Sequence, residues 1–215
     1  MGKRTWSPWG GEYRRTPDRY VFGRDASTFA REILRLLRPR ARVLDLGCGE
    51  GRDSVFFASR GCEVTGVEMS LEGLRKAERL AAERGVRPRW VCGSLANLPV
   101  AGRFDLVYSC GSVHYVARAA RARLFRRLRA LTAPGGYQAH LVFTDRRVHP
   151  EKGERIDYFA PGELERLYAG WAILKSAEGV IPCAQDGTAH LHSVAVLVGR
   201  RTGAVSATRR RSRRA

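Results

Sequence analysis

Apolar and polar positions follow one another along the chain in blocks that predict strands and helices by turns. The run Val-Leu-Asp-Leu at residues 43–46 has the character of the end of a buried strand, and a helix over 50–60 follows it at once. Further strands are expected at 62–68, 90–93, 104–111, 137–144, 171–178 and 189–199, and further helices at 25–37, 70–85, 118–130 and 161–168. Helices separate the first five strands, which is typical of an α/β fold built on a parallel sheet.

Three regions of the chain differ in composition. Residues 1–24 combine five large aromatic side chains with glycine, proline and arginine and show no sustained period, so we expect an irregular arm that packs on another surface and acts as a lid. Residues 25–199 hold all the predicted strands and form one domain, in which the polar loop 145–158 is long enough to cover a substrate. Residues 200–215 contain seven arginines and no acid, which predicts a disordered basic tail.

Three glycines at alternate positions, Gly47, Gly49 and Gly51, join the first strand to its helix. Glycine allows a tight turn and a close approach of the backbone to a ligand, and the first turn of the helix directs free N–H groups at the same place. A flexible surface loop is the alternative, but the buried strand before the turn and the helix after it favour a ligand-binding turn. Arg52 occupies the third glycine position of the dinucleotide fingerprint Gly-x-Gly-x-x-Gly, so an NAD-dependent oxidoreductase is disfavoured.

The sequence Asp-Leu-Gly-Cys-Gly-Glu-Gly at 45–51 resembles motif I of the class I S-adenosylmethionine (SAM) methyltransferases. The predicted strand 104–111 and its exit loop resemble motif IV, and Pro-Gly-Gly at 134–136 matches the turn before strand five in that family. This resemblance implies a Rossmann-like sheet of seven mostly parallel strands with an antiparallel last strand, helices on both faces, and SAM as the cofactor. More narrowly, stretches at 49–58, 64–70, 168–171 and 189–192 resemble the tellurite-resistance methyltransferase group.

The acid at the end of the second strand is a candidate for holding a nucleoside. Glu68 lies 17 residues beyond Gly51, and an acid at that strand end in nucleoside-binding α/β folds accepts hydrogen bonds from the ribose hydroxyls. A solvated strand-end acid is the alternative. Ser94 stands where the family usually has an aspartate for adenine. By resemblance, the cofactor-binding set is Asp45, Gly47, Cys48, Gly49, Gly51, Arg52, Glu68, Met69, Ser94, Leu95, Ser109 and Cys110.

Three histidines are candidates for catalysis. Ligands bind outside the carboxyl ends of parallel strands; His114 follows such an end, and an antiparallel last strand would bring His190 and His192 to the same edge. Packed or capping imidazoles are the alternative for all three, and His140 is expected in the core. The exit loop Ser-Cys-Gly-Ser at 109–112 contains no acid. We therefore expect the histidines to hold a small acceptor whose nucleophile is soft or already anionic, such as a thiol or a chalcogen oxyanion.

The formal net charge of +18 raises a nucleic-acid function as an alternative. The seven arginines of the tail leave +11 for residues 1–199, where basic residues interleave with leucines on predicted helices such as 118–130 and would form solvated faces. The chain also lacks an Asn/Asp-Pro-Pro-Tyr/Phe signature after the fourth strand. We therefore expect a small-molecule substrate rather than nucleic acid, with a natural-product O- or N-methyltransferase and a nucleic-acid-directed methyltransferase as the alternatives.

The five cysteines include no Cys-x-x-Cys pair and indicate neither a disulfide framework nor a zinc site, so we expect reduced thiols and no metal. No apolar run approaches the ~20 residues of a membrane span, and the first residues lack an apolar signal core. We expect a cytoplasmic protein without a membrane partner, either a monomer or a homodimer.

Overall fold

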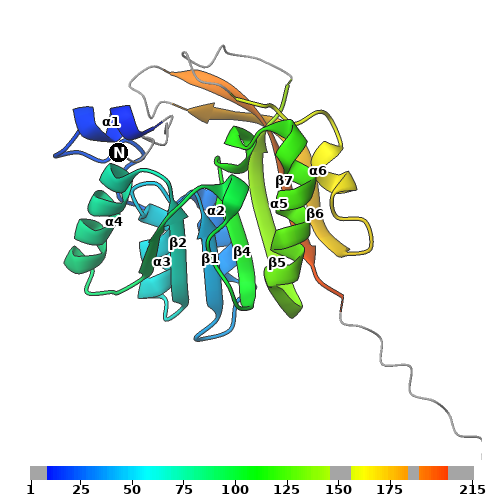
Figure 1. Ribbon diagram of the computed structural model, residues 1–215, viewed down its shortest axis with the longest axis horizontal. Coiled ribbons are helices and arrows are strands. Elements are labelled where there is room, and N and C mark those ends of the chain that lie inside the picture. The colour runs from blue at the N-terminus through cyan, green and yellow to red at the C-terminus, as the bar shows by residue number, and fades with distance from the viewer. Residues whose placement is uncertain (1–8, 146–155, 184–188, 203–215) are drawn as a thin grey trace, which may run out of the picture.

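Residues 9–145, 156–183 and 189–202 are described by the computed structural model, and they contain a seven-stranded sheet with helices on both faces (Figure 1). The strands are β1 (Arg42–Leu46), β2 (Glu63–Glu68), β3 (Arg89–Cys92), β4 (Phe104–Cys110), β5 (Thr132–Phe143), β6 (Ala172–Cys183) and β7 (His190–Arg200). Their order is β3-β2-β1-β4-β5-β7-β6; the first five are parallel, and β7 runs antiparallel to both of its neighbours. The predicted fold class is therefore confirmed.

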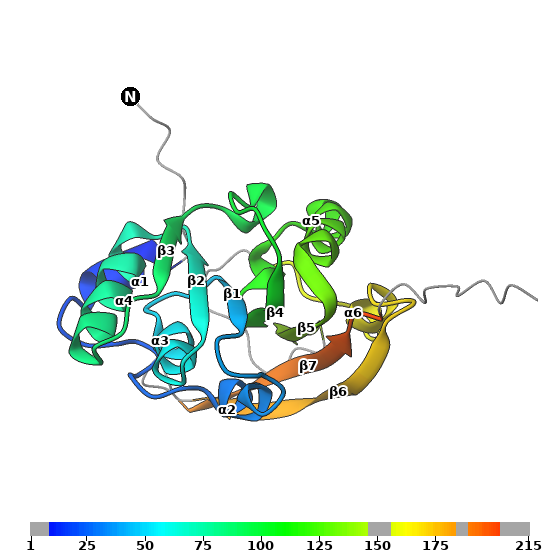
Figure 2. The same cartoon turned by 90° about the horizontal axis from the view of Figure 1, so that it is seen from below.

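Two layers of helices enclose the sheet. The helices are α1 (Gly10–Arg15), α2 (Thr28–Leu34), α3 (Arg52–Ser59), α4 (Leu71–Glu83), α5 (Arg118–Leu131) and α6 (Glu163–Arg166), with 3-10 turns η1 (Leu95–Asn97) and η2 (Val113–Tyr115). Because side chains alternate along β4, Leu106 packs with Phe57 on the layer of α2 and α3, whereas Val107 packs with Phe125 of α5 on the other. Figure 2 shows these layers on opposite sides of the sheet.

Some boundaries differ from the prediction. The arm, expected to be irregular, contains α1, which begins with two glycines of low helix propensity and is held by packing on α4. Helix α2 ends at Leu34 and not at residue 37. Strand β6 continues to Cys183, well past the predicted end, because an edge strand tolerates a proline such as Pro182.

The arm is fastened to the domain by a buried lysine. Lys76 of α4 forms an ion pair with Glu50 at 2.7 Å, and its ammonium group also donates to the Thr16 hydroxyl at 3.0 Å and to the Arg19 carbonyl at 2.9 Å. All three ammonium protons thereby have partners away from water. Arg52 adds a hydrogen bond to the carbonyl of Phe22 at 2.7 Å. The expectation that the arm packs on another surface is therefore met for residues 9–24.

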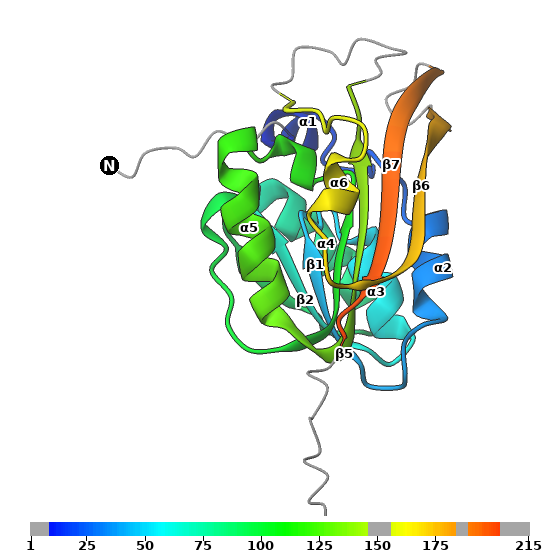
Figure 3. The ribbon, with the colours of Figure 1, turned by 90° about the vertical axis from the view of Figure 1, so that its right-hand side faces the viewer.

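Strands β6 and β7 continue beyond the end of β5 as a hairpin. Strand β7 pairs with β5 only from Val194 onward, whereas it pairs with β6 from His190 onward. In Figure 1 this part of the hairpin leans across the top of the sheet toward α1. Figure 3 shows β6 at the outer edge of the sheet, where Leu174 and Val180 are about half exposed, at 52% and 51%.

The predicted basic tail from residue 203 and residues 146–155 of the predicted cover loop lie outside the described residues. Among the residues that are described, no helix has the length and apolar character needed to span a membrane.

Candidate active site

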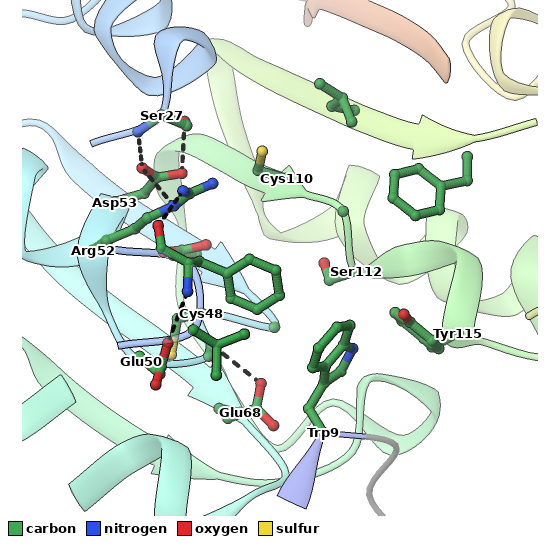
Figure 4. Close-up of a pocket in the computed structure, with 18 of the residues that line it drawn as sticks. Trp9, Ser27, Cys48, Glu50, Arg52, Asp53, Glu68, Cys110, Ser112 and Tyr115 are labelled. Carbon is green, nitrogen blue, oxygen red and sulfur yellow. Dashed lines mark hydrogen bonds and ion pairs between the residues drawn. The ribbon is translucent and has the colours of Figure 1, made fainter. Parts of the chain in front are cut away.

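A cavity of about 860 Å³ lies at the carboxyl ends of the parallel strands. Its first end, which we name the turn end, is bounded by the glycine turn after β1, the end of β2 and the loop after β3. Its second end, the hairpin end, is bounded by η2, the end of β5 and the β6–β7 hairpin. Trp9, Tyr13 and Phe22 of the arm also line it, and Figure 4 shows Trp9 and Tyr115 around the same opening.

The glycines of the turn have left-handed backbone conformations, with φ of 68° at Gly47, 55° at Gly49 and 84° at Gly51. Space is restricted as well. A Cβ at Gly47 would lie 2.4 Å from the Cβ of Ser112, and one at Gly51 would lie 2.6 Å from the Cβ of Ala77. The turn therefore requires glycine because of the side chains packed against it, in addition to any ligand.

Glu68 ends β2 inside the cavity, with 8% of its surface exposed. Its carboxylate accepts hydrogen bonds from the N–H groups of Gly49 at 3.2 Å and Ser70 at 2.8 Å. Burial raises the pKa of this carboxyl, and the same two N–H groups oppose the rise. The side chain is thus fixed beside the glycine turn, with lone pairs left for hydroxyl donors.

Three more acidic residues line the turn end: Asp45, Asp53 and Glu50, the last of which is paired with Lys76. Burial, followed by the charge of Asp53, raises the pKa of Asp45 to about 7, although the Ser54 hydroxyl donates to Asp45 at 2.6 Å. Asp53, in the first turn of α3, accepts hydrogen bonds from the N–H of Ser27 at 2.7 Å and the hydroxyl of Tyr108 at 2.8 Å. Together with Glu68, these acids give the turn end a local concentration of carboxylates that suits a cationic ligand.

Ten of the predicted cofactor-binding residues line the cavity: Asp45, Gly47, Cys48, Gly49, Arg52, Glu68, Met69, Ser94, Leu95 and Cys110. Their contact with a cofactor stays a prediction. Burial raises the pKa of the Cys110 thiol to about 12 and that of Cys48 well above its ordinary value, so both are protonated at neutral pH. These two thiols line the wall and are poor nucleophiles.

The hairpin end has a different chemistry. It is lined by Ser112, Tyr115, Leu141, Phe143, Cys183, His190 and His192, and none of these described residues carries a carboxylate. The Nε2 atoms of His190 and His192 lie 3.0 Å apart and are hydrogen-bonded, while the His192 ring stacks on Phe143 with centroids 4.2 Å apart. The two histidines thus meet at the expected edge of the sheet, and their catalytic role stays a prediction.

Three predicted site residues do not line the cavity. His114 is fully buried because η2 turns its ring behind Phe143, on which it stacks with centroids 4.3 Å apart. Burial lowers the pKa of His114 to about 3, so the ring is neutral at physiological pH. Ser109 lies on the core side of β4, hydrogen-bonded to the buried His140 at 2.7 Å, and Gly51 caps α3 beneath the turn. The roles of these three residues in binding or catalysis stay predictions, and none of the three lines the cavity in this structure.

Several residues of the site were missed in the sequence. Tyr13 and Tyr115 reach the cavity only through the packing of the arm and the form of η2, for which no local pattern exists. Asp53 could have been predicted as a site residue, because it is an acid in the first turn of a helix that directly follows a glycine turn. Cys183 could have been predicted as well, because it becomes the cross-strand partner of His190 when the last two strands pair as a hairpin.

Known proteins resemble this chain in sequence and in fold. Residues 43–136 match a family described as a methyltransferase domain. Trans-aconitate 2-methyltransferase of Deinococcus radiodurans is 32% identical over 173 residues, which cover 77% of this chain and 62% of that protein. Malonyl-[acyl-carrier protein] O-methyltransferase of Pseudescherichia vulneris is 30% identical over 171 residues, which cover 73% of this chain and 64% of that protein.

TehB from Haemophilus influenzae has a similar fold, with a TM-score of 0.73 at 19% identity over 80% of this chain and 61% of that one. The chain spans about three fifths of the length of the two curated relatives, at 62% and 64%.

Proposed function

We propose that the protein is a class I, SAM-dependent methyltransferase that transfers a methyl group from SAM to a small-molecule acceptor, since residues 43–136 match a methyltransferase domain and the two curated relatives are methyltransferases. One observation carries the proposal: a single cavity has the glycine turn and Glu68 at one end and a pair of histidines at the other. Such an arrangement would bring cofactor and acceptor together in one space, where fixed orientation lowers the barrier to reaction.

The chemistry of the turn end fits SAM. Glu68 would accept hydrogen bonds from the ribose hydroxyls, and the backbone N–H groups in the first turn of α3, directly after the glycine turn, would bind the carboxylate of the methionine part. The carboxylates of Asp45 and Asp53 favour the positive charges of the cofactor, and Met69 and Leu95 offer apolar contact for adenine. When bound, SAM supplies an electrophilic methyl group on a positively charged sulfur.

The protein residues then orient the acceptor and exclude water. Trp9 and Phe22 pack edge to face with ring centroids 4.9 Å apart and form an apolar wall over the turn end. We assign the arm a lid function on this basis, since a wall held by Lys76 and Arg52 keeps solvent from the space above the turn. An enclosed site also protects the reactive cofactor from water.

We place the acceptor at the hairpin end, next to His190 and His192. Because no carboxylate lines that end among the described residues, a nucleophile that is soft or already anionic is favoured, as it needs no strong base. An imidazole N–H can donate a hydrogen bond to such an anion. A thiol or a selenium or tellurium oxyanion meets this description. His114, which is buried behind Phe143, is left out of the assignment.

An oxygen acceptor is the second candidate. It is favoured by the names of the two curated relatives, one of which acts on trans-aconitate and the other as an O-methyltransferase on a malonyl group. Both names describe compounds with carboxyl groups, whose oxygens are harder nucleophiles than a thiolate. The arginine beside the turn, Arg52, lines the same cavity and offers a charge for such a substrate.

A transfer assay with methyl-labelled SAM tests the proposal and separates the candidates. The acceptors are benzenethiol, selenite, tellurite, trans-aconitate, a simple phenol and RNA. We expect label in the thiol or in an oxyanion of selenium or tellurium. Label only in trans-aconitate or phenol would establish the oxygen acceptor, and label in RNA would support the nucleic-acid alternative. No label in any acceptor, together with no binding of SAM, would refute the function.

A further inference from the structure

Three side chains with metal-binding atoms meet where β6 and β7 form the hairpin. Cys183 is the cross-strand partner of His190, and His192 lies two residues further along the same strand, so all three project from one face of the hairpin. The sulfur of Cys183 and one ring nitrogen of each histidine lie within 4.8 Å of one another. No metal was expected from the sequence, which has no Cys-x-x-Cys motif; strand pairing brings these three ligands together.

We propose that Cys183, His190 and His192 bind one divalent transition-metal ion of the zinc type, and that the remaining coordination position takes a thiolate from the cavity. Two imidazole nitrogens bound to one zinc ion at ~2.0–2.1 Å are roughly 3.3 Å apart in tetrahedral geometry. The Nε2 atoms of His190 and His192 lie 3.0 Å apart, so they already have nearly the spacing of two ligands. An ion replaces the hydrogen bond between the two rings.

The third ligand requires a small adjustment. A sulfur bound at about 2.3 Å lies roughly 3.6 Å from each bound nitrogen, and the Cys183 sulfur is within 4.8 Å of one ring nitrogen of each histidine. Cys183 is the last residue of β6 and is only partly buried, so its side chain has room to rotate toward an ion. His192 is held more firmly, because its ring stacks on Phe143 at 4.2 Å.

The ligand set selects the metal. One thiolate and two imidazoles suit zinc, cobalt and other transition ions, whereas magnesium and calcium prefer oxygen ligands. Three protein ligands leave the fourth position of a tetrahedral ion open, as in catalytic rather than structural zinc sites. All three residues line the cavity of the proposed methyl transfer, so that position is accessible to an acceptor.

A thiol fits the open position for a chemical reason. A thiol that coordinates a zinc-type ion loses its proton, which passes to solvent, and is bound as the thiolate. This would supply an anionic nucleophile at a cavity end that lacks a carboxylate base among the described residues. The link from thiolate to methyl acceptor rests on the proposed function, whereas the metal site itself does not.

Metal binding by the full-length protein is the first test. The protein is stripped with a chelator, dialysed against zinc or cobalt, and its metal content measured by atomic spectrometry. We expect one ion per chain, with a sulfur-to-cobalt charge-transfer band in the cobalt form. Cys183→Ser should abolish the band and weaken binding at least tenfold, and His192→Ala should weaken it similarly. Cys92→Ser, at an exposed cysteine outside the cluster, is the matched control and should retain both metal and band.

Several outcomes would overturn the site. These are no retained metal, or metal retained equally by Cys183→Ser, His192→Ala and Cys92→Ser, with circular dichroism showing that each variant is folded. The thiolate position is tested by adding 2-mercaptoethanol to the cobalt form, whose visible spectrum should shift; an unchanged spectrum would refute thiol coordination. SAM is titrated into the same metal-free protein. SAM binding without metal binding would refute only this inference, and metal binding without SAM binding would refute only the proposed function.

Discussion

The two ends of the cavity hold their side chains in different ways. At the turn end, Glu68 and Asp53 accept hydrogen bonds from backbone N–H groups, and the close contact of Gly47 with Ser112 leaves no room for another residue. At the hairpin end, the histidines and Cys183 stand on two strands that extend past the sheet. We infer that the turn end holds one ligand in one position, whereas the hairpin end can adjust to its acceptor.

Two ion pairs of similar length make the contrast measurable. Lys76 and Glu50, under the arm at the turn end, are 2.7 Å apart with side chains 3% and 2% exposed; Lys175 of β6 and Glu32 are 2.8 Å apart but 41% and 44% exposed. We expect Lys76→Met to lower the free energy of unfolding by about 3–5 kcal/mol, because it leaves the Glu50 charge buried without its partner.

The exposed pair is the matched control for this change. Lys175→Met should alter the free energy of unfolding by only about 0–1 kcal/mol, since water screens both of its charges. Denaturant unfolding followed by circular dichroism measures both variants. If both variants lost the same free energy of unfolding, the buried ion pair at the turn end would contribute no more stability than the exposed pair at the edge of the sheet.

A single methyl group at the glycine turn should have the next largest effect. In Gly47→Ala the new Cβ would lie 2.4 Å from the Cβ of Ser112, so the turn must move, and we expect SAM to bind at least ~100-fold more weakly, about 2.7 kcal/mol. Gly85→Ala is the control: Gly85 has nearly the same φ, 66°, but nothing lies within 4 Å of its added Cβ.

Calorimetric titration with SAM compares these glycine variants. Gly85→Ala should bind SAM like the unaltered protein, and adding Ser112→Gly to Gly47→Ala should recover part of the lost affinity by removing the obstructing Cβ. Normal SAM affinity in Gly47→Ala would mean that the cofactor does not depend on the form of this turn.

The smallest expected effect is a dependence of SAM affinity on pH, caused by an acid at the turn end. Asp45 has its pKa raised to about 7, mainly by burial, and a cationic ligand would favour its charged form. SAM affinity should therefore rise about tenfold between pH 6 and pH 8, as binding releases a proton. Asp45→Asn should make the affinity independent of pH over this range. If SAM affinity in Asp45→Asn still changed with pH, the proton released on binding would belong to another group.

The same carboxyl group affects stability with a defined sign. The folded chain keeps the Asp45 proton up to about pH 7, whereas the unfolded chain releases it near its ordinary value. The contribution of this group to the free energy of unfolding is thus present at low pH and is lost as the pH rises toward 7. Asp45→Asn should remove that part of the pH dependence in the unfolding measurements.

The positions of the residues at the turn end could largely be predicted from the sequence, whereas those at the hairpin end could not. Gly47 directly follows β1 and Glu68 is the last residue of β2, so their positions depend only on local structure and on the parallel sheet. Cys183 was placed in the loop between the predicted strands 171–178 and 189–199 because Pro182 was assigned to that loop, although an edge strand tolerates a proline. His114 was placed correctly at a strand exit, but η2 turned the ring into the core, which no pattern of apolar residues reveals.

The structure of the arm could also be predicted from the sequence only in part. Its aromatic residues predicted that it packs on the domain, and residues 9–24 do so. Its helix α1 was missed because its stability comes from packing on α4 rather than from its own glycine-rich sequence. The buried pair of Lys76 and Glu50 joins residues 26 positions apart, so it too becomes visible only in the folded chain.

The division of the cavity into a cofactor end and an acceptor end is tested most directly by titrating SAM into Glu68→Ala and His192→Ala by calorimetry. We expect Glu68→Ala to weaken SAM binding by ~1–3 kcal/mol, because ribose hydroxyls lose their acceptor. His192→Ala should leave SAM affinity unchanged while turnover per Michaelis constant for the acceptor falls about 10- to 1000-fold. Glu63→Ala, at the exposed start of the same strand as Glu68, serves as the control. Equal weakening by the Glu68 and His192 variants, or unaltered affinity in Glu68→Ala, would contradict the account.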